Sequence, residues 1–177
     1  MKQTRSAVRR ATVFSRMLLA AALAVLIPVA VAPVAAQGEE PLRWFGDSFD
    51  DITMLVYGVP HSDYVAVIFG CKRGERFVKV GLQDEDSGAE EGVPLPVRMA
   101  AAGRQIEFSE KGVRNQDSGG IELHARLPLD ETLRRILGSS GRLDITIAGR
   151  TQHYDMAGAA KPAAKMLAAC DATTAGQ

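Results

Sequence analysis

The sequence predicts a mainly β domain of the α+β kind, an antiparallel β-sandwich or half-open barrel of about eight short strands with two short helices. Short runs rich in β-branched and aromatic residues recur between position 37 and the C-terminus, and Gly, Pro and Asp separate them. Only two stretches space their apolar residues as a helix does. Such strands must stack or close to hide their edges, and the pattern leaves both arrangements open.

Residues 1–36 are typical of a secretory signal. An uncharged run from Met17 to Ala32 follows a basic start, and small residues from Val34 to Ala36 precede Gln37. We expect cleavage after Ala36 and a single secreted domain over 37–177; the alternative is a retained membrane anchor, because the apolar segment approaches the length of a span. The basic residues of this start are Lys2, Arg5, Arg9, Arg10 and Arg16.

The charge balance changes when the signal is removed. All 21 acidic residues follow position 36, so the remaining domain is mildly acidic. Such a domain has no general attraction for nucleic acid or for anionic membranes. We therefore expect a periplasmic or secreted protein with no nucleic-acid partner and no membrane span after cleavage.

The first strands are predicted in "ITMLVYG", "YVAVIFGC" and "RFVKVGLQ", with turns at "VPHSD" and "KRGE". Alternation places Cys71 on the side of Val65, Val67 and Phe69. A hairpin of "VRMAAAG" and "RQIEFSE" comes next. In "GIELHARL" the apolar residues alternate with outward Glu122, His124 and Arg126, which predicts a sheet with one face in water.

The predicted helices flank the last hairpin. "DETLRRILG" has Asp130 as its N-cap and Gly138 as its stop. The strands "RLDITIA" and "TQHYDM" join through a two-residue turn at Gly149-Arg150. The second helix runs from Gly158 to Cys170, with its apolar stripe at Ala160, Ala163, Leu167 and Cys170.

The chain has two cysteines, Cys71 and Cys170, and both occupy predicted apolar faces. In an oxidising compartment such a pair usually forms one disulfide. The bond would tie the C-terminal helix to the sheet. A redox-active pair is the alternative, but no Cys-x-x-Cys spacing is present.

The sequence offers little for catalysis. It contains neither a Gly-x-Ser-x-Gly elbow nor a glycine-rich phosphate loop before a helix. Asp47, Asp50 and Asp51 form a carboxylate cluster that either serves a hydrolase or occupies a turn between strands. We expect no enzyme activity and no cofactor.

We also expect no metal site. Two histidines, His124 and His153, fall on polar strand faces, and His61 lies in a turn, so surface histidines are the better interpretation. An acidic loop either binds calcium or is only solvated. Ala89 stands where a helix-loop-helix calcium site requires glycine, which favours the solvated loop. The acidic residues of this loop are Asp84, Glu85, Asp86, Glu90 and Glu91.

Two groups of residues are candidates for binding. Arg73, Arg104 and Arg150 lie at predicted hairpin tips and form a basic rim for an anionic partner if the tips meet at one end. The turn after "LVYGVP" offers a polar and aromatic recognition surface or seals the end of a sheet. Its residues are Tyr57, His61, Asp63 and Tyr64.

The order of Trp44, "YGVPHSDYVAVIFGC" and "GRLDITIAGRTQHYDMAGAAKPAAKMLAAC" resembles a set of small secreted proteins from proteobacterial genomes. The resemblance implies an exported β-rich domain with paired cysteines. More distantly, the Trp, mid-chain Cys and terminal Cys helix look like the TagO-type periplasmic accessory proteins of type VI secretion. The start of "CKRGERFVKVGL" is similar to periplasmic lysozyme inhibitors.

These observations together favour a non-enzymatic periplasmic or secreted module. We expect it to bind or assist an envelope protein or a cell-wall polymer. Lysozyme inhibition and hydrolysis at the Asp47 cluster are the alternatives.

Overall fold

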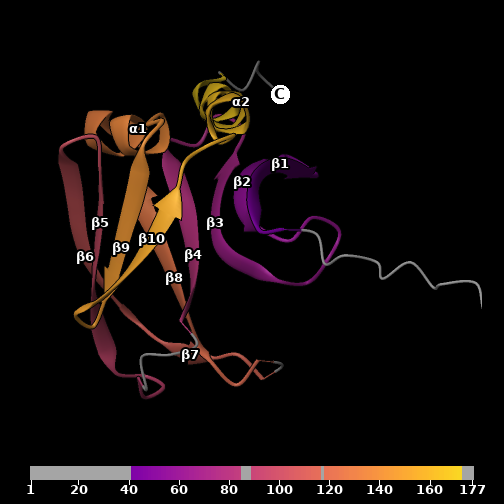
Figure 1. Cartoon of the computed structure of the whole chain (residues 1–177). Coiled ribbons are helices and arrows are strands. Elements are labelled where there is room, and N and C mark those ends of the chain that lie inside the picture. Colours follow the sequence, from indigo (N-terminus) through magenta and orange to yellow (C-terminus); the bar gives the residue numbers. More distant parts are fainter. Residues whose placement is uncertain (1–40, 85–88, 117, 173–177) are drawn as a thin grey trace, which may run out of the picture. The chain divides into compact units, whose positions relative to one another are not determined.

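The computed structural model describes residues 41–84, 89–116 and 118–172, all within the compact unit Gly38–Gln177. These residues form two antiparallel sheets of six and four strands and two helices (Figure 1). The mainly β prediction is confirmed, and the two separate sheets correspond to its sandwich form. The predicted signal peptide lies outside the described residues.

The larger sheet holds the first four strands of the domain. Short turns join these four strands in sequence order. The strand next to the fourth in space follows it in sequence only after two strands of the smaller sheet. In spatial order the sheet contains β1 (Arg43–Phe49), β2 (Ile52–Gly58), β3 (Val65–Lys72), β4 (Phe77–Asp84), β8 (Ile121–Pro128) and β7 (Val113–Arg114).

The smaller sheet consists of two hairpins. In spatial order it contains β10 (Arg150–Asp155), β9 (Arg142–Ile147), β5 (Pro94–Ala101) and β6 (Arg104–Lys111). Both turns have two residues with positive φ, 50° and 69° at Ala102-Gly103 and 50° and 86° at Ala148-Gly149. This is the geometry that matches the twist of a hairpin.

The prediction of Gly149-Arg150 as the second turn was wrong by one residue. Arg150 is already the first residue of β10 and pairs with Ile147. The turn therefore begins at Ala148, an alanine that occupies a left-handed conformation and gives no turn signal in the sequence.

One core fills the space between the sheets. In β8 the apolar residues are buried and the alternation predicted for this strand is confirmed. The sheets meet at Gly112, between β6 and β7, where a Cβ atom would lie 2.4 Å from Cγ2 of Ile121. On the other side, Nε1–H of Trp44 donates to the carbonyl oxygen of Asp155 at 2.8 Å and ties β1 to the end of β10.

Both helices lie at the same end of the sheets (Figure 1). The first, α1 (Glu131–Leu137), begins as predicted, because Oδ1 of Asp130 accepts a hydrogen bond from the backbone N–H of Leu133 at 2.8 Å. Gly138 ends it, as predicted.

The second helix, α2 (Ala160–Asp171), packs against β1, β2 and β3. Its buried stripe differs from the predicted one: Met166 faces the core, whereas Leu167 is half-buried and Ala160 is exposed. Pro162 packs against Gly46 of β1: a Cβ atom added at Gly46 would lie 3.1 Å from the Cβ of Pro162, so the helix lies close to this strand.

The predicted disulfide between Cys71 and Cys170 is confirmed. The Cα atoms are 5.5 Å apart, and both side chains are buried. The bond fastens the last turn of α2 to the end of β3. Beside it, the guanidinium of Arg134 on α1 makes two hydrogen bonds, of 2.8 and 2.5 Å, to the carboxylate of Asp171. The C-terminal helix is thus held by both the sheet and the other helix.

Candidate binding groove on the six-stranded sheet

The outer face of the larger sheet is unusually apolar at its centre. Strand β2 buries Leu55 in the shared core and turns Ile52, Met54 and Val56 to the opposite face. Val56 is only 3% exposed although it lies outside that core. An antiparallel sheet that faces water on one side normally carries polar residues there, so this face departs from the usual pattern.

The strand register aligns the outward residues in two rows. One row runs across β2, β3, β4 and β8 as Val56, Ile68, Gly81 and His124. The adjacent row consists of Met54, Gly70, Lys79 and Arg126. Each row has a glycine between larger side chains, and the two glycines are on neighbouring strands. The surface is therefore hollowed along a line that crosses β3 and β4.

Two adjoining cavities occupy this hollow, which we call the outer groove. The larger has a volume of about 390 Å³, and the smaller, about 240 Å³, shares Ile68, Gly81 and His124 with it and extends to Asp63 and Glu122. The side chains and glycines that line the larger cavity are Ile52, Met54, Ile68, Gly70, Lys79, Gly81, His124 and Arg126.

The two glycines contribute differently to the groove. At Gly81 a Cβ atom would lie 2.6 Å from Cγ2 of Ile68, so the absence of a side chain lets Ile68 lie over β4. At Gly70 the nearest atoms would be Cγ2 of Ile52 at 3.5 Å and Cγ of Met54 at 3.6 Å, which are ordinary contacts. Gly81 is thus required by packing, whereas Gly70 leaves space that a side chain could fill.

Two cations stand at one side of the groove. Lys79 and Arg126 are exposed and directly opposite each other in the β4–β8 ladder. Arg126 lies 4.3 Å from the ring centroid of Phe77 and 3.9 Å from Oε2 of Glu75, and Lys79 has no hydrogen bond or ion pair within the described part of the chain. Like charges directly opposite one another destabilise a sheet.

The structure does not bring the three predicted arginine tips together. The β5–β9 ladder pairs Ala100 with Asp144, so the tip that carries Arg104 lies beside the start of β9. The tip before Arg150 lies at the other end of the same ladder, where the N–H of Ala148 donates to Pro96 O at 3.0 Å. Arg73 occupies the β3–β4 turn, and no single basic rim forms.

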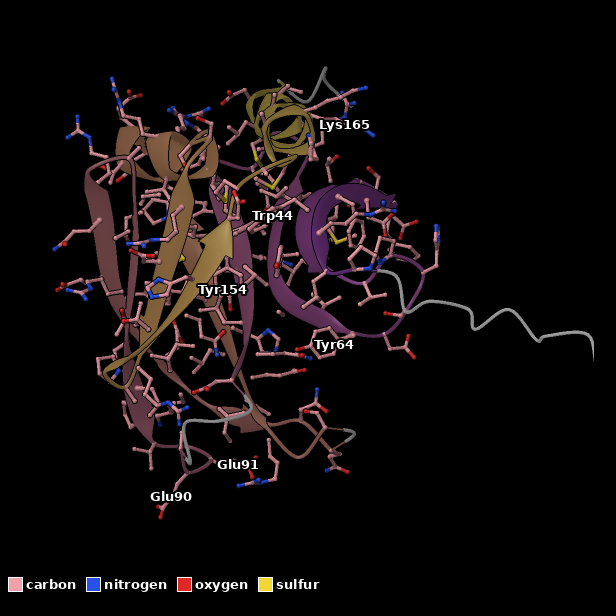
Figure 2. The ribbon with its side chains drawn as sticks, viewed as in Figure 1. Trp44, Tyr64, Glu90, Glu91, Tyr154 and Lys165 are labelled. Carbon is pink, nitrogen blue, oxygen red and sulfur yellow. A yellow bond between two sulfur atoms is a disulfide. The ribbon has the colours of Figure 1, made fainter. Side chains whose placement is uncertain are left out.

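The predicted aromatic turn is also divided. Tyr57 is half-buried in the core, with its ring 5.0 Å from that of Trp44 and 5.2 Å from that of Tyr154. His61, Asp63 and Tyr64 are exposed at the β2–β3 turn, as Figure 2 shows for Tyr64. Tyr57 thus seals the sheet end, and of the three exposed residues Asp63 lines the smaller cavity.

The histidines lie on different surfaces. His124 faces the outer groove, whereas His153 lies on the outer face of the smaller sheet, with Nδ1 2.7 Å from Oδ1 of Asp144. That hydrogen bond lowers the pKa of the Asp144 carboxyl. Across residues 41–84, 89–116 and 118–172, no group of three or more His, Cys, Asp or Glu side chains is placed to hold a metal ion.

Two of the three aspartates of the predicted carboxylate cluster lie in a turn between strands. Asp50 and Asp51 form the two-residue turn between β1 and β2, and Asp51 pairs with Lys72 at 3.0 Å. Asp47 is exposed on β1, and none of the three lines the outer groove.

The acidic loop is described only in part, because Glu85 and Asp86 lie outside the described residues. Asp84 is buried at the end of β4. Glu90 and Glu91 lie at the end of the domain opposite α2 (Figure 2).

Sequence reasoning missed the groove, although two signals for it were present. "ITMLVYG" is apolar at successive positions, which indicates a strand with apolar contacts on both faces. Gly70 and Gly81 are glycines inside predicted strands, where a missing side chain often marks a close approach. Only the register shows that they are neighbours.

Comparison of the chain with protein-family models, with curated proteins and with solved structures gives no significant match. None of the helices formed by the described residues has the length and apolar character needed to cross a membrane.

Proposed function

We propose that the chain is an exported, non-enzymatic binding module that holds an apolar group of a cell-envelope component in the outer groove. The observation that carries this proposal is the apolar hollow at Gly70, lined by Ile52, Met54 and Ile68, on the outer face of the six-stranded sheet. Its larger cavity, about 390 Å³, falls in the range of about 300–1,000 Å³ usual for small-molecule sites.

The scaffold suits a binding role. The groove floor lies on β2, β3 and β4, which have a strand on each side, and β8 borders it, paired with β4 along its length and with β7 only at Ile121 and Glu122. The disulfide fastens α2 to the end of β3 behind this face. A site on paired strands loses little conformational freedom when it binds, so more of the contact energy remains as affinity.

The disulfide is compatible with a periplasmic or extracellular location. Export itself is tested by fractionating cells of the native host and determining the N-terminus of the protein by mass spectrometry. A mature chain beginning at Gln37 in the periplasm or medium supports the proposal. An intact N-terminus in the cytoplasm contradicts it.

Binding is tested by titrating the purified protein with Nile red, a neutral apolar dye whose fluorescence rises on leaving water. Gly70→Val fills the groove at a position where a Cβ atom meets only ordinary contacts. We expect it to weaken dye binding by about tenfold or more, a change of about 1.4 kcal/mol.

The matched control is Gly141→Ala, whose added Cβ has no neighbouring atom within 4 Å. It should bind the dye as the unmodified protein does. Equal binding by all three proteins would place the dye elsewhere and remove the groove as the site.

The resemblances to TagO-type accessory proteins and to lysozyme inhibitors stay predictions. Titration against C-type and other lysozymes checks the second, and undiminished cell-wall lysis at excess protein removes it. Hydrolysis at Asp47, Asp50 and Asp51 finds no support in the exposed positions of these residues.

A further inference from the structure

We infer that the ligand of the outer groove is a single-chain amphiphile with one anionic head, such as a fatty acid, whose head lies between Lys79 and Arg126. The inference rests on the proposed function and specifies its ligand. It follows from the charges at the groove, from its floor and from its far end.

The head position follows from the opposed cations. Residues directly opposite in an antiparallel pair have Cβ atoms about 4.5–5.5 Å apart, so the ammonium of Lys79 and the guanidinium of Arg126 can reach the same oxyanion. A carboxylate accepts charge-assisted hydrogen bonds from both, and arginine offers a planar fork for such a group. The anion also removes the repulsion between the two cations.

The floor favours an alkyl chain. Ile52, Met54 and Ile68 line the larger cavity together with Gly70, which leaves space between Ile52 and Met54. Since this floor lies on β2, β3 and β4, which are interior strands, the backbone groups beneath it already bond to neighbouring strands. An extended peptide on this floor would lose water from its own N–H and C=O groups without replacement. A hydrocarbon chain has no such groups and loses nothing of this kind.

The far end of the groove restricts the ligand to one anionic group. The smaller cavity is lined by Asp63 and by Glu122, whose Oε2 lies 3.2 Å from Nε2 of His124; two carboxylates outnumber one imidazole, so this end carries net negative charge. A dicarboxylate or a polyanion that extended along the groove would meet these carboxylates and be repelled. An apolar tail is not repelled by them.

The test is isothermal titration calorimetry of the full mature protein with decanoate, decanol and acetate, each below any critical micelle concentration. We expect decanoate to bind at least ~10-fold more tightly than decanol, as one charged hydrogen bond in a partly dry site implies. Acetate, which lacks the tail, should show no measurable binding.

Two variants separate head from tail. Lys79→Gln/Arg126→Gln should reduce decanoate affinity to that of decanol, whereas Lys165→Gln on α2, at the helical end of the domain (Figure 2), should leave it unchanged. Gly70→Val should weaken decanoate and decanol together. Thermal unfolding of each variant establishes that it is folded.

Equal affinities for decanol and decanoate, or an unchanged decanoate affinity in Lys79→Gln/Arg126→Gln, would overturn the anionic head and leave the apolar groove of the proposed function standing. Failure to bind decanoate combined with sedimentation on phosphatidylglycerol vesicles would show a membrane contact and overturn the inference. Nile red binding that Gly70→Val leaves unchanged is a separate result, and it counts against the proposed function.

Discussion

The fold alters the acidity of the Tyr154 hydroxyl. It is only 6% exposed, and its hydroxyl donates a hydrogen bond to Oε1 of Gln152. Burial disfavours the phenolate, and the nearby Tyr64, Tyr57 and Asp84 act in the same direction, which together raise the pKa of Tyr154 to about 12. A phenol of this kind keeps its proton well into the alkaline range.

The raised pKa of Tyr154 predicts a loss of stability at high pH. The pKa rises from 10.0 to about 12 on folding, so the stabilisation is complete below the unfolded value and disappears as the pH rises through the folded one. Ultraviolet titration should show one tyrosine ionising near pH 12, and Tyr154→Phe should remove that phase. A titration that is the same in Tyr154→Phe would contradict this assignment.

The two hairpin turns predict a stabilising substitution. Ala102 and Ala148 both have φ of 50°, where a Cβ atom costs about 1–2 kcal/mol. Asparagine tolerates this conformation, and Asn-Gly is the preferred pair for such turns. We expect Ala102→Asn and Ala148→Asn each to raise the free energy of unfolding by up to about 1 kcal/mol, measured by urea denaturation.

Ala157→Asn is the matched control for these turn variants. Ala157 is exposed and does not have a positive φ, so the same substitution should have little effect there. Equal stabilisation at all three positions would show that the gain has nothing to do with turn geometry.

At the scale of the element, the disulfide is the strongest single constraint. It closes a loop whose ends are 99 residues apart. We expect Cys71→Ser/Cys170→Ser to lower the free energy of unfolding by about 2–5 kcal/mol, because the unfolded chain regains the freedom that the bond removes. Urea denaturation with and without reductant measures the effect.

Reductant supplies the control for the disulfide. It should shift the denaturation midpoint of the unmodified protein toward that of the double variant and leave the double variant unchanged. The prediction fails if the two proteins unfold at the same urea concentration under oxidising conditions.

Most elements could be predicted from local sequence, and the exceptions have physical reasons. The start and end of α1 follow from Asp130 and Gly138, which act within one turn. Two strands were missed: β7 has only two residues, and β1 contains Gly46 and Asp47, which are rare in strands. The strand β1 forms because β2 pairs with it along its whole length.

At the scale of the whole molecule, one core joins the two sheets, and this predicts cooperative unfolding. The buried cluster includes residues of both sheets and of both helices. Trp44 is the chain's single tryptophan and reports on the contact between β1 and β10. We expect its fluorescence and the far-ultraviolet circular dichroism to change at the same urea concentration. Two separate midpoints would show that the sheets unfold independently.

The outer groove is formed in part by strands that are distant in sequence, so local sequence patterns could not predict it. Its rows depend on the pairing of β4 with β8, strands that are separated in sequence by the β5–β6 hairpin. Alternation alone indicates that Lys79 and Arg126 point outward, but only the register places them opposite each other. The disulfide was predictable because the chain has only two cysteines, whereas basic residues offer many pairings.

Two contacts tie early strands of the domain to late segments, and they restrict when the domain can fold during synthesis or translocation. Trp44 bonds to Asp155, and Cys71 joins Cys170, so each tie links an early strand to a late segment. A ribosome or a translocation pore releases β1 first and α2 last. The first three strands therefore emerge before α2 can cover their face, and neither tie can form until the late segment has emerged. Formation of the disulfide therefore requires that the chain has emerged as far as Cys170.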